Sequence, residues 1–459
     1  MTKVSGLNLE DIENLKIQKL ITQVPSFSWD RTWNTFIRLT KLVSNVISFV
    51  SAGYAIATQM SVWGIGIIFF VIPEAFFRFK YNIKIKQFRD SNAEKLKYAN
   101  YIHSRSMYLS NFPELRVDNV FSSFIKSFKQ TTESYYKRQN NIRKKRDLHA
   151  FFWSWFDASL KRLMQIILIP ISIAQRYSIG TFKYLYDFID NIYDSSWNVI
   201  WQCLMIKSNS LYVKDYFDLF EYQGFGDIAS GNETLDPLTT PRLKFVNVSF
   251  NYPESPSAAL SNISFTIEPG EKVAIIGHDN SGKSTTAKLL CGLYRVSPGD
   301  ILIDKISIKN LARGELKNKI SIVFENYIKY NFSIRKNITV TEPERDFNRR
   351  LYEEALEISE IKDLMDELLI DENQILGKMF GNGINISTGH WQRLAIARAI
   401  YRDRPILILD ESFTQIDGFS RRPIMQKIIK HRPKQTFINI TQDDIHTDLF
   451  DKIIYIEDG

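Results

Sequence analysis

The residue pattern best suited to chemistry is the loop from Gly277 to Ser284, which reads Gly-His-Asp-Asn-Ser-Gly-Lys-Ser. It fits the pattern G-x-x-x-x-G-K-[ST], in which backbone N–H groups and the start of a helix hold phosphate groups. In this pattern Lys283 supplies a positive charge to the β- and γ-phosphates, and the Ser284 hydroxyl is a ligand for Mg²⁺. The predicted nucleotide-binding residues here are Gly277, Asn280, Ser281, Gly282, Lys283, Ser284 and Thr285.

A second candidate for chemistry is a pair of adjacent carboxylates, Asp410 and Glu411, which follow the apolar run Ile406–Leu409. Four apolar residues predict a buried strand whose C-terminal end presents both acids. We expect Asp410 to hold Mg²⁺ through water and Glu411 to orient or deprotonate the attacking water. Together with the phosphate-binding loop, the pair predicts hydrolysis of a nucleoside triphosphate.

The elements that must position these residues are predicted from an alternation of short β-branched runs with helical stretches. Such alternation predicts an α/β domain over residues 241–459. The segment Gln223–Thr240, rich in Gly, Ser, Thr, Asn and Asp, has the composition of a linker. Residues 1–222 are predicted to form a separate helical domain. The strands expected in the α/β domain are Lys272–Ile276, Ile320–Phe324, Ile406–Leu409, Thr436–Ile440 and Lys452–Ile456.

The helical half contains an uncharged apolar stretch, Leu42–Pro73. A single helix of that length measures about 48 Å, against a bilayer core of about 30 Å. The stretch therefore fits one tilted span, or two spans joined by a polar turn near Thr58, Gln59 and Ser61. A buried pair of helices in a soluble protein is the remaining alternative.

The segment Lys80–Arg146 is highly charged and contains the basic run Arg143–Arg146. A basic excess beside an apolar segment is typical of the cytoplasmic side of a membrane protein, and few Gly or Pro residues interrupt it. Long helices that extend from the membrane are therefore expected. A nucleic-acid surface is the alternative, but no recognition motif accompanies the run, so no nucleic-acid partner is predicted.

Three acidic residues, Asp187, Asp190 and Asp194, have the spacing that places them on one face of a helix. Lipid would reject such a face, so it must contact protein, a water-filled lumen or solvent. It can be the lining of a pathway for a cationic substrate. The alternative, which we favour, is a helix that lies partly outside the membrane.

Composition excludes several classes of protein. The chain has 459 residues, a formal net charge of +8 and 2 cysteines. Two cysteines cannot form a disulfide framework, and no close Cys/His cluster indicates a zinc site. With 20 Gly and 14 Pro the chain is not collagen-like. The first residues contain acids and lack an apolar core, so no signal peptide is predicted.

The segment Ile386–Ala399 (ISTGHWQRLAIARA) completes a set of motifs that resembles one family. The order of phosphate-binding loop, S-x-G followed by Q-R-x-A-x-A-R-A, and Asp-Glu strand resembles the ATP-binding cassette (ABC) ATPases. The resemblance implies that Ser387 and Gly389 contact the γ-phosphate of ATP bound by a partner subunit. It also implies that Tyr252 stacks on adenine.

Three positions depart from the family pattern. Glu325 stands where the family has the Gln of its lid loop, which reaches toward Mg²⁺, and Gln442 stands where it has a catalytic switch His. His390 replaces the Gln of the S-x-G segment. Losing one charge-assisted hydrogen bond to a phosphate costs roughly 1.5–3 kcal/mol, or about 10- to 150-fold in rate. We therefore expect slow hydrolysis, or, as the alternative, a catalytically weak regulatory subunit of a heterodimer.

The helical half resembles, more weakly, the membrane domain of fused bacterial ABC exporters for peptides, lipids or drugs. On this resemblance the chain carries the last four of six membrane helices and stops before the usual closing segment of the ATPase. A half-transporter of this kind is an integral protein of the plasma membrane with its ATPase in the cytoplasm. Its partners are a second half-transporter, the lipid bilayer and a transported substrate that the sequence does not identify.

Overall fold

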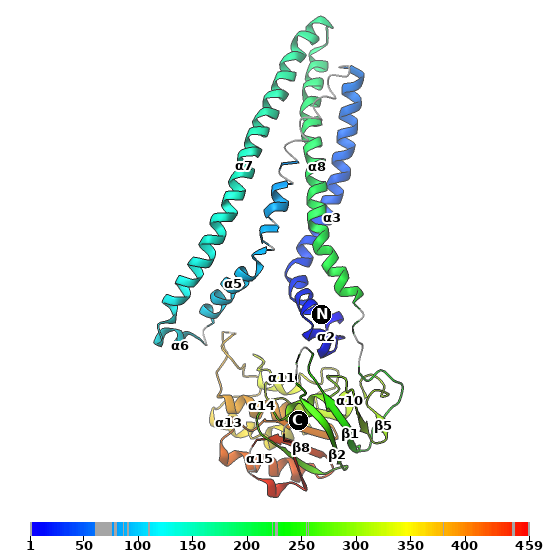
Figure 1. Cartoon of the computed structure of the whole chain (residues 1–459), viewed down its shortest axis with the longest axis vertical. Helices are drawn as coiled ribbons and strands as arrows, with labels where there is room; N and C mark the ends of the chain where they lie inside the picture. The colour runs from blue at the N-terminus through cyan, green and yellow to red at the C-terminus, as the bar shows by residue number, and fades with distance from the viewer. Residues whose placement is uncertain are drawn as a thin grey trace. The chain divides into compact units, whose positions relative to one another are not determined.

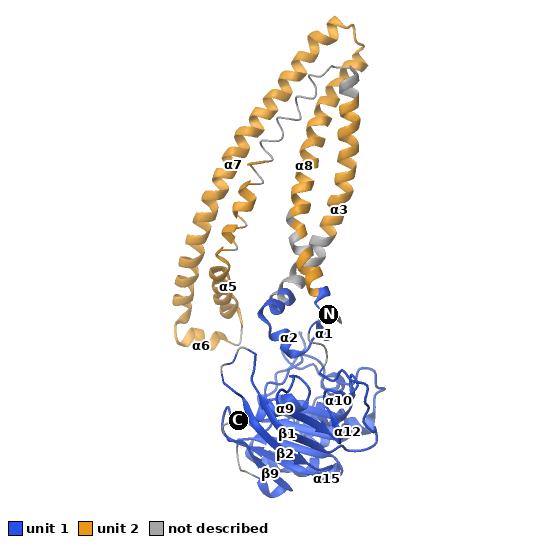
Figure 2. Cartoon of the chain, turned by 45° about the vertical axis from the view of Figure 1, so that its right-hand side comes forward, with its two compact units in different colours: residues 1–21, 220–459 blue, residues 22–219 orange. Residues whose placement is uncertain are grey.

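The computed structural model describes residues 2–59, 76–77, 80–85, 87–89, 91–108, 111–222, 224, 228–253, 255, 257–379, 381–442 and 446–457. The chain divides into two compact units (Figure 2). One unit joins residues 1–21 to residues 220–459, and the other is formed by residues 22–219. The architecture is a helical region followed by an α/β domain, as the sequence predicts.

The unit of residues 22–219 is built from long helices (Figure 1). Helices α3 and α8 lie side by side, where Arg38 Nη1 donates to Gln202 Oε1 at 3.3 Å. Helix α5 packs along α7. The buried core of this unit contains Leu168 of α7 and Leu185 and Ile189 of α8. The bounds are α3 Leu15–Gln59, α5 Ala93–Met107, α6 Phe112–Val117, α7 Val120–Ala174 and α8 Ile179–Glu221.

The acidic face expected on α8 is largely paired with basic residues. Lys183 Nζ lies 2.6 Å from Asp187 Oδ1. Lys161 Nζ of α7 lies 2.7 Å from Asp190 Oδ1. Two of the three carboxylates are thus bound to lysines, which disfavours their interpretation as a lining for a cationic substrate.

The uncharged stretch falls partly in helix α3. Residues 42–59 continue the helix without interruption, and residues 60–73, including Ser61 of the expected turn, lie outside the described residues. Among the helices that the structure describes, none has the length and apolar content needed to cross a bilayer.

The α/β domain contains a five-stranded parallel sheet in the order β6-β7-β8-β3-β9. All five strands expected from the sequence are present, because each is an apolar or β-branched run. Strands β3, β6, β7 and β8 are largely buried on both faces, whereas the edge strand β9 is partly exposed. The bounds are β3 Lys272–Ile276, β6 Ile320–Val323, β7 Ile406–Asp410, β8 Thr436–Thr441 and β9 Lys452–Tyr455.

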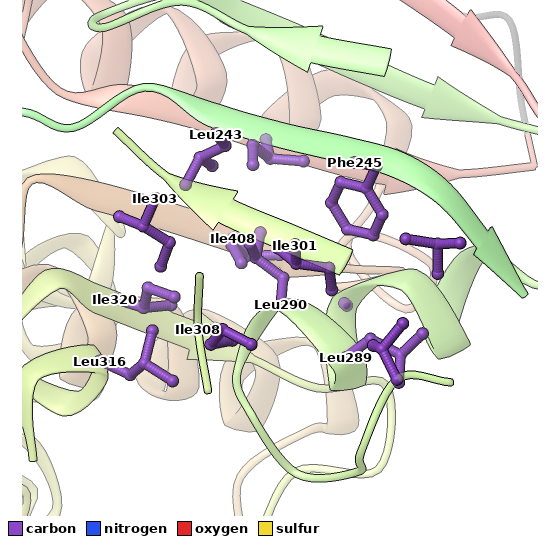
Figure 3. Packing of buried hydrophobic residues seen from close by; sticks show 14 of the residues in the cluster. Leu243, Phe245, Leu289, Leu290, Ile301, Ile303, Ile308, Leu316, Ile320 and Ile408 are labelled. Atoms are coloured by element: carbon purple, nitrogen blue, oxygen red, sulfur yellow. The ribbon is translucent and has the colours of Figure 1, made fainter. Parts of the chain in front are cut away.

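A second, antiparallel sheet has the order β2-β1-β4-β5. Its strands are β1 Leu243–Phe250, β2 Leu260–Ile267, β4 Asp300–Ile303 and β5 Ile306–Ser307. Leu289 and Leu290 of helix α9 (Lys283–Leu290) pack with Phe245 of β1 and Ile408 of β7 in one buried cluster (Figure 3). The cluster draws residues from both sheets, so it anchors the helix that follows the phosphate-binding loop.

The remaining helices of this unit are short. Their bounds are α1 Thr2–Ser5, α2 Leu9–Glu13, α10 Glu315–Lys319, α11 Ile334–Thr339, α12 Arg349–Ile358, α13 Ile361–Glu367, α14 Thr388–Tyr401, α15 Gly418–His431 and the 3₁₀ helix η3 Thr447–Leu449.

The segment expected to be a linker packs on the α/β domain where the structure describes it. Leu235 is 5% exposed and belongs to the core cluster. The ammonium of Lys319 donates to the carbonyl oxygens of Asp236 and Thr239. Turn-forming residues dominate the composition of the segment, yet its few apolar side chains are enough to attach it.

Candidate nucleotide-binding and catalytic site

The phosphate-binding loop, the Asp-Glu pair and Gln442 lie at the ends of three neighbouring strands of the parallel sheet. The phosphate-binding loop follows β3, Asp410 ends β7, and Gln442 follows β8. Because the carboxyl ends of parallel strands share one edge of a sheet, residues far apart in the chain meet there. The order β7-β8-β3 therefore brings the loop and the Asp-Glu pair to one edge.

The backbone of the phosphate-binding loop requires glycine at Gly282. Its φ is +97°, and a Cβ there would lie 2.5 Å from the carbonyl oxygen of Ala259. Gly282 is also the N-cap residue of α9, so the loop leads directly into the helix. The N–H groups at this helix start face the region where an anion would bind. Asn280, two residues earlier, also has a positive φ, of 62°.

The side chain of Lys283 turns back over the loop. Its ammonium donates to the carbonyl oxygens of Gly277 at 2.8 Å and His278 at 2.6 Å, and the residue is 4% exposed. Ser281 is also 4% exposed, and within the described residues its hydroxyl has no hydrogen-bond partner. A buried hydroxyl of this kind is expected to bind a ligand. The loop thus presents a positive charge and an unsatisfied hydroxyl to an anion.

The loop and the Asp-Glu strand are joined by one hydrogen bond. Ser284 Oγ donates to Asp410 Oδ1 at 3.0 Å. Asp410 is 2% exposed, and this burial raises the pKa of its carboxyl to about 6, with Glu411 and Glu325 adding to the effect. The hydroxyl of Ser284 opposes the rise because it stabilises the charged form.

Glu411, Glu325 and the phosphate-binding loop line one cavity of about 410 Å³. Glu411 has a positive φ of 48°, which is rare for a residue with a Cβ, and its N–H donates to the carbonyl oxygen of Ile440 at 2.9 Å. That hydrogen bond to β8 fixes the backbone from which the carboxylate projects. The sequence-predicted acids are thus brought together around the loop.

Tyr252 lines the same cavity and is held against helix α9. Its hydroxyl lies 3.0 Å from Thr285 Oγ1 and accepts a hydrogen bond from Lys288 Nζ at 3.2 Å. The ring of Tyr294 packs edge-on against it, with centroids 5.3 Å apart. These contacts present a fixed aromatic face, which suits stacking on a flat base.

Ser387 and Gly389 lie at the start of α14, and among the described residues they do not line this cavity. The Ser387 hydroxyl accepts the N–H of His390 at 3.2 Å and lies 2.9 Å from His390 Nδ1. Burial, aided by Arg393, lowers the pKa of His390, so its ring is neutral at pH 7. A Cβ on Gly389 would lie 2.7 Å from the carbonyl oxygen of Gln415, so the position requires glycine.

Two features of this unit are not visible in the sequence. Asp279, at a position where the loop pattern specifies no residue type, accepts a hydrogen bond from Gln442. Helix α2 contacts Tyr294, the residue that packs against Tyr252. Glu13 Oε1 of this helix accepts a hydrogen bond from the hydroxyl of Tyr294 at 2.6 Å. Neither contact has a local signal, because its partners are far apart in the sequence.

Comparison with known proteins shows which family the α/β domain matches. Residues 260–414 match the ABC transporter family model. The subtilin transport ATP-binding protein SpaT of Bacillus subtilis is 25% identical over 100% of this chain and 74% of its own length. The nisin transport ATP-binding protein NisT of Lactococcus lactis is 26% identical over 100% of this chain and 76% of its own length.

A solved structure shows the same fold. A bacterial Atm1-family ABC exporter with ATP bound superposes with a TM-score of 0.79, at 19% identity, and covers 100% of this chain and 79% of that one. Residues 260–414 thus match the ABC transporter family, and the chain has the exporter-type order of a half-transporter like SpaT and NisT, with a helical region fused ahead of one ATPase domain.

Proposed function

We propose that this chain binds and hydrolyses ATP as one subunit of a dimeric ABC exporter. The observation that carries the proposal is the Ser284–Asp410 hydrogen bond, with Glu411 in the same cavity. It joins a phosphate-binding loop to a catalytic carboxylate pair. The names of SpaT and NisT, which align over 100% of this chain, support transport as the purpose of that hydrolysis.

Binding of ATP is assigned to the loop and to Tyr252. The N–H groups at the start of α9, the ammonium of Lys283 and the hydroxyl of Ser281 would hold the phosphates. Lys283 would exchange the carbonyl oxygens of Gly277 and His278 for phosphate oxygens. Tyr252 would stack on the adenine.

The donor set near Ser284 fits Mg²⁺. Mg²⁺ is commonly bound by one or two protein oxygens together with phosphate oxygens and water, so a dense cluster of acids is unnecessary. Ser284 Oγ and Asp410 Oδ1 supply such oxygens, with Glu325 lining the same cavity. When bound, the ion would neutralise charge that develops on the phosphates.

Hydrolysis is assigned to Glu411 and Gln442. The Glu411 carboxylate would accept a proton from water or orient it. Gln442 Nε2 donates to Glu411 Oε1 at 3.0 Å and so restricts the carboxylate. Slow turnover because of Glu325, Gln442 and His390 remains a prediction, which a Gln442→His variant with raised turnover would support.

The positions of Ser387 and Gly389 support assembly of this chain as a dimer. Both lie at a helix start outside the cavity of their own chain, so they are available to nucleotide bound by a second half-transporter. Two ATP molecules would then lie between two ATPase domains. Closure and hydrolysis would switch the helical domains between access states.

We assign the helical domain predicted for residues 1–222 to the plasma membrane, except for residues 1–21, which join the unit of the ATPase domain. Residues 241–459 are assigned to the cytoplasm, with residues 223–240 joining the two domains. The uncharged stretch Leu42–Pro73 and the basic segment that follows it support this arrangement. The names of SpaT and NisT give subtilin and nisin as what they transport, so these two are the substrates to test first.

The test is steady-state phosphate release by the purified full chain in lipid nanodiscs. We expect Mg²⁺-dependent turnover that Glu411→Gln abolishes while ATP binding persists, and that Lys283→Ala abolishes together with binding. Lys305→Ala, at an exposed lysine outside the cavity, is the matched control. Turnover that survives Glu411→Gln would refute the catalytic assignment, and carbonate extraction of the chain from membranes would refute the membrane assignment.

A further inference from the structure

Asp279 is an acidic side chain of the phosphate-binding loop to which the proposed mechanism gives no role. Its Oδ1 accepts a hydrogen bond from Gln442 Nε2 at 2.5 Å. The same nitrogen donates to Glu411 Oε1 at 3.0 Å and Oε2 at 3.2 Å. One amide group therefore lies between two carboxylates that come from different strands.

The orientation of the Gln442 amide is determined by its neighbours. An ionised carboxylate only accepts hydrogen bonds, so the NH₂ end of the amide must face both Asp279 and Glu411. One proton is directed at Asp279 and the other is shared by the two oxygens of Glu411. Rotation of the amide would bring its own oxygen against a carboxylate, which is repulsive.

The backbone keeps the three residues in this relationship. Asp279 follows β3, Gln442 follows β8 and Glu411 follows β7, and these strands are neighbours in one sheet. The N–H of Glu411 is fixed to Ile440 of β8 by a 2.9 Å hydrogen bond. With the backbone fixed, only the side-chain torsions of the three residues stay variable, and the hydrogen bonds among them determine those torsions.

We propose that Asp279 is a positioning residue for ATP hydrolysis: it orients the Gln442 amide, whose second N–H aims the Glu411 carboxylate. The inference rests on the proposed ATPase function and adds a residue to it. Without an acceptor at position 279, the amide loses one of the two partners that orient it, and Glu411 is held less firmly in its direction. A neutral acceptor at this position preserves the orientation.

The kinetic test compares Asp279→Ala with Asp279→Asn in the full chain. Asparagine keeps an oxygen that can accept from Gln442, whereas alanine does not. We expect Asp279→Ala to lower kcat about three- to tenfold, the value of one exposed hydrogen bond, without raising KM, because removing a negative charge near the phosphates favours ATP. Asp279→Asn should keep most of the kcat that Asp279→Ala loses.

A double substitution separates positioning from loop structure. In a Gln442→Ala chain the orienting contact is already absent, so Asp279→Ala should not lower kcat further. Asp346→Ala, at an exposed aspartate outside the cavity, is the control. The proposal is overturned if Asp279→Asn loses as much kcat as Asp279→Ala, or if Asp279→Ala lowers kcat equally in both backgrounds.

A readout without turnover keeps this inference distinct from the proposed function. Thermal unfolding of the four full-length chains, without nucleotide, measures the coupling between positions 279 and 442. We expect the decreases in melting temperature of Asp279→Ala and Gln442→Ala to add up to about 2 °C more than the decrease of the double variant. Additive shifts would overturn the inference, whereas absence of turnover in the unaltered chain would overturn only the proposed ATPase function.

Discussion

Ser284 Oγ donates a hydrogen bond to Asp410 Oδ1 at 3.0 Å, and this contact joins the start of helix α9 to the end of strand β7. The carboxylate that receives it is 2% exposed. A single neutral donor does not replace the hydration that a carboxylate loses on burial. The buried carboxylate of Asp410 therefore destabilises the ligand-free chain, and binding of a cation would offset that cost.

Substitution Asp410→Asn is expected to stabilise the chain in the absence of Mg²⁺ and nucleotide. Burial raises the pKa of Asp410 to about 6, so at pH 7.5 the charged form is disfavoured in the folded state. Asparagine removes that charge and keeps an acceptor for Ser284, which should raise the melting temperature by roughly 2–4 °C. Phosphate release should fall to background, since the amide is a poor Mg²⁺ ligand.

The comparison needs a control for removal of any carboxylate. Asp366→Asn, at an exposed aspartate of α13, should leave the melting temperature unchanged. If Asp410→Asn lowers the melting temperature in EDTA, neighbouring groups already stabilise the buried charge of Asp410, and the prediction is wrong.

Tyr252 provides the second prediction, which concerns the base rather than the phosphates. Stacking of an aromatic ring on a nucleobase contributes about 1–3 kcal/mol, so Tyr252→Ala should weaken ATP binding about tenfold. Tyr252→Phe removes the hydroxyl that contacts Thr285 and Lys288 but keeps the ring, and should bind ATP nearly as tightly.

Calorimetric titration of a Glu411→Gln chain with MgATP measures both affinities without turnover. Tyr455→Ala, at an exposed tyrosine at the end of β9, controls for loss of an aromatic residue. If Tyr252→Phe and Tyr252→Ala weaken binding equally, the hydroxyl contacts rather than the ring are responsible, and the stacking role is wrong.

Local patterns predicted the parts of the site that depend on contiguous residues. The loop Gly277–Ser284 requires a glycine at a positive φ and a lysine beside it, so its residue types are visible in the sequence. The run Ile406–Leu409 marks its strand because all of its residues are buried. What a local pattern cannot contain is a contact between residues that only the topology brings together.

Two contacts illustrate this limit. Asp279 and Gln442 meet because β3 and β8 are neighbours in the sheet, although 163 positions separate them in the chain. The spacing of Asp190 relative to the neighbouring aspartates predicts a shared helix face. Its partner Lys161, however, lies on another helix. Residue spacing gave the face correctly and could not give what the face contacts.

His390 provides a prediction on pH. Burial is the main cause that lowers its pKa below the ordinary 6.5, so the folded chain resists protonation of this ring. The unfolded chain takes up that proton first as the pH falls through 6.5, so the contribution of His390 to stability is present at pH 7.5 and is lost on acidification. His390→Gln should therefore lose less melting temperature between pH 7.5 and pH 5.5 than the unaltered chain.

Thermal unfolding at the two pH values measures this difference directly. His431→Gln is the matched control, because His431 is an exposed histidine at the end of α15. An equal loss of melting temperature on acidification in the His390→Gln and unaltered chains would show that His390 titrates alike in the folded and unfolded states.

The ion pair between Lys161 of α7 and Asp190 of α8 provides the last prediction. Lys161 Nζ lies 2.7 Å from Asp190 Oδ1, with side-chain exposures of 18% and 36%, and Gln165 Nε2 donates to the same oxygen at 2.9 Å. Lys161→Met leaves a half-buried carboxylate without its cation, which should destabilise the chain by about 1 kcal/mol. Lys161→Met combined with Asp190→Leu removes both charges and should recover most of that stability.

The neighbouring pair Lys183–Asp187 is the matched control, because its side chains are 69% and 50% exposed. Water and salt screen such a pair, so Lys183→Met should change the melting temperature little. Destabilisation that is equal for Lys183→Met and Lys161→Met would show that burial does not distinguish the pairs. A double variant less stable than Lys161→Met would show that the carboxylate of Asp190 serves something other than Lys161, and would revive its interpretation as a site for a cationic substrate.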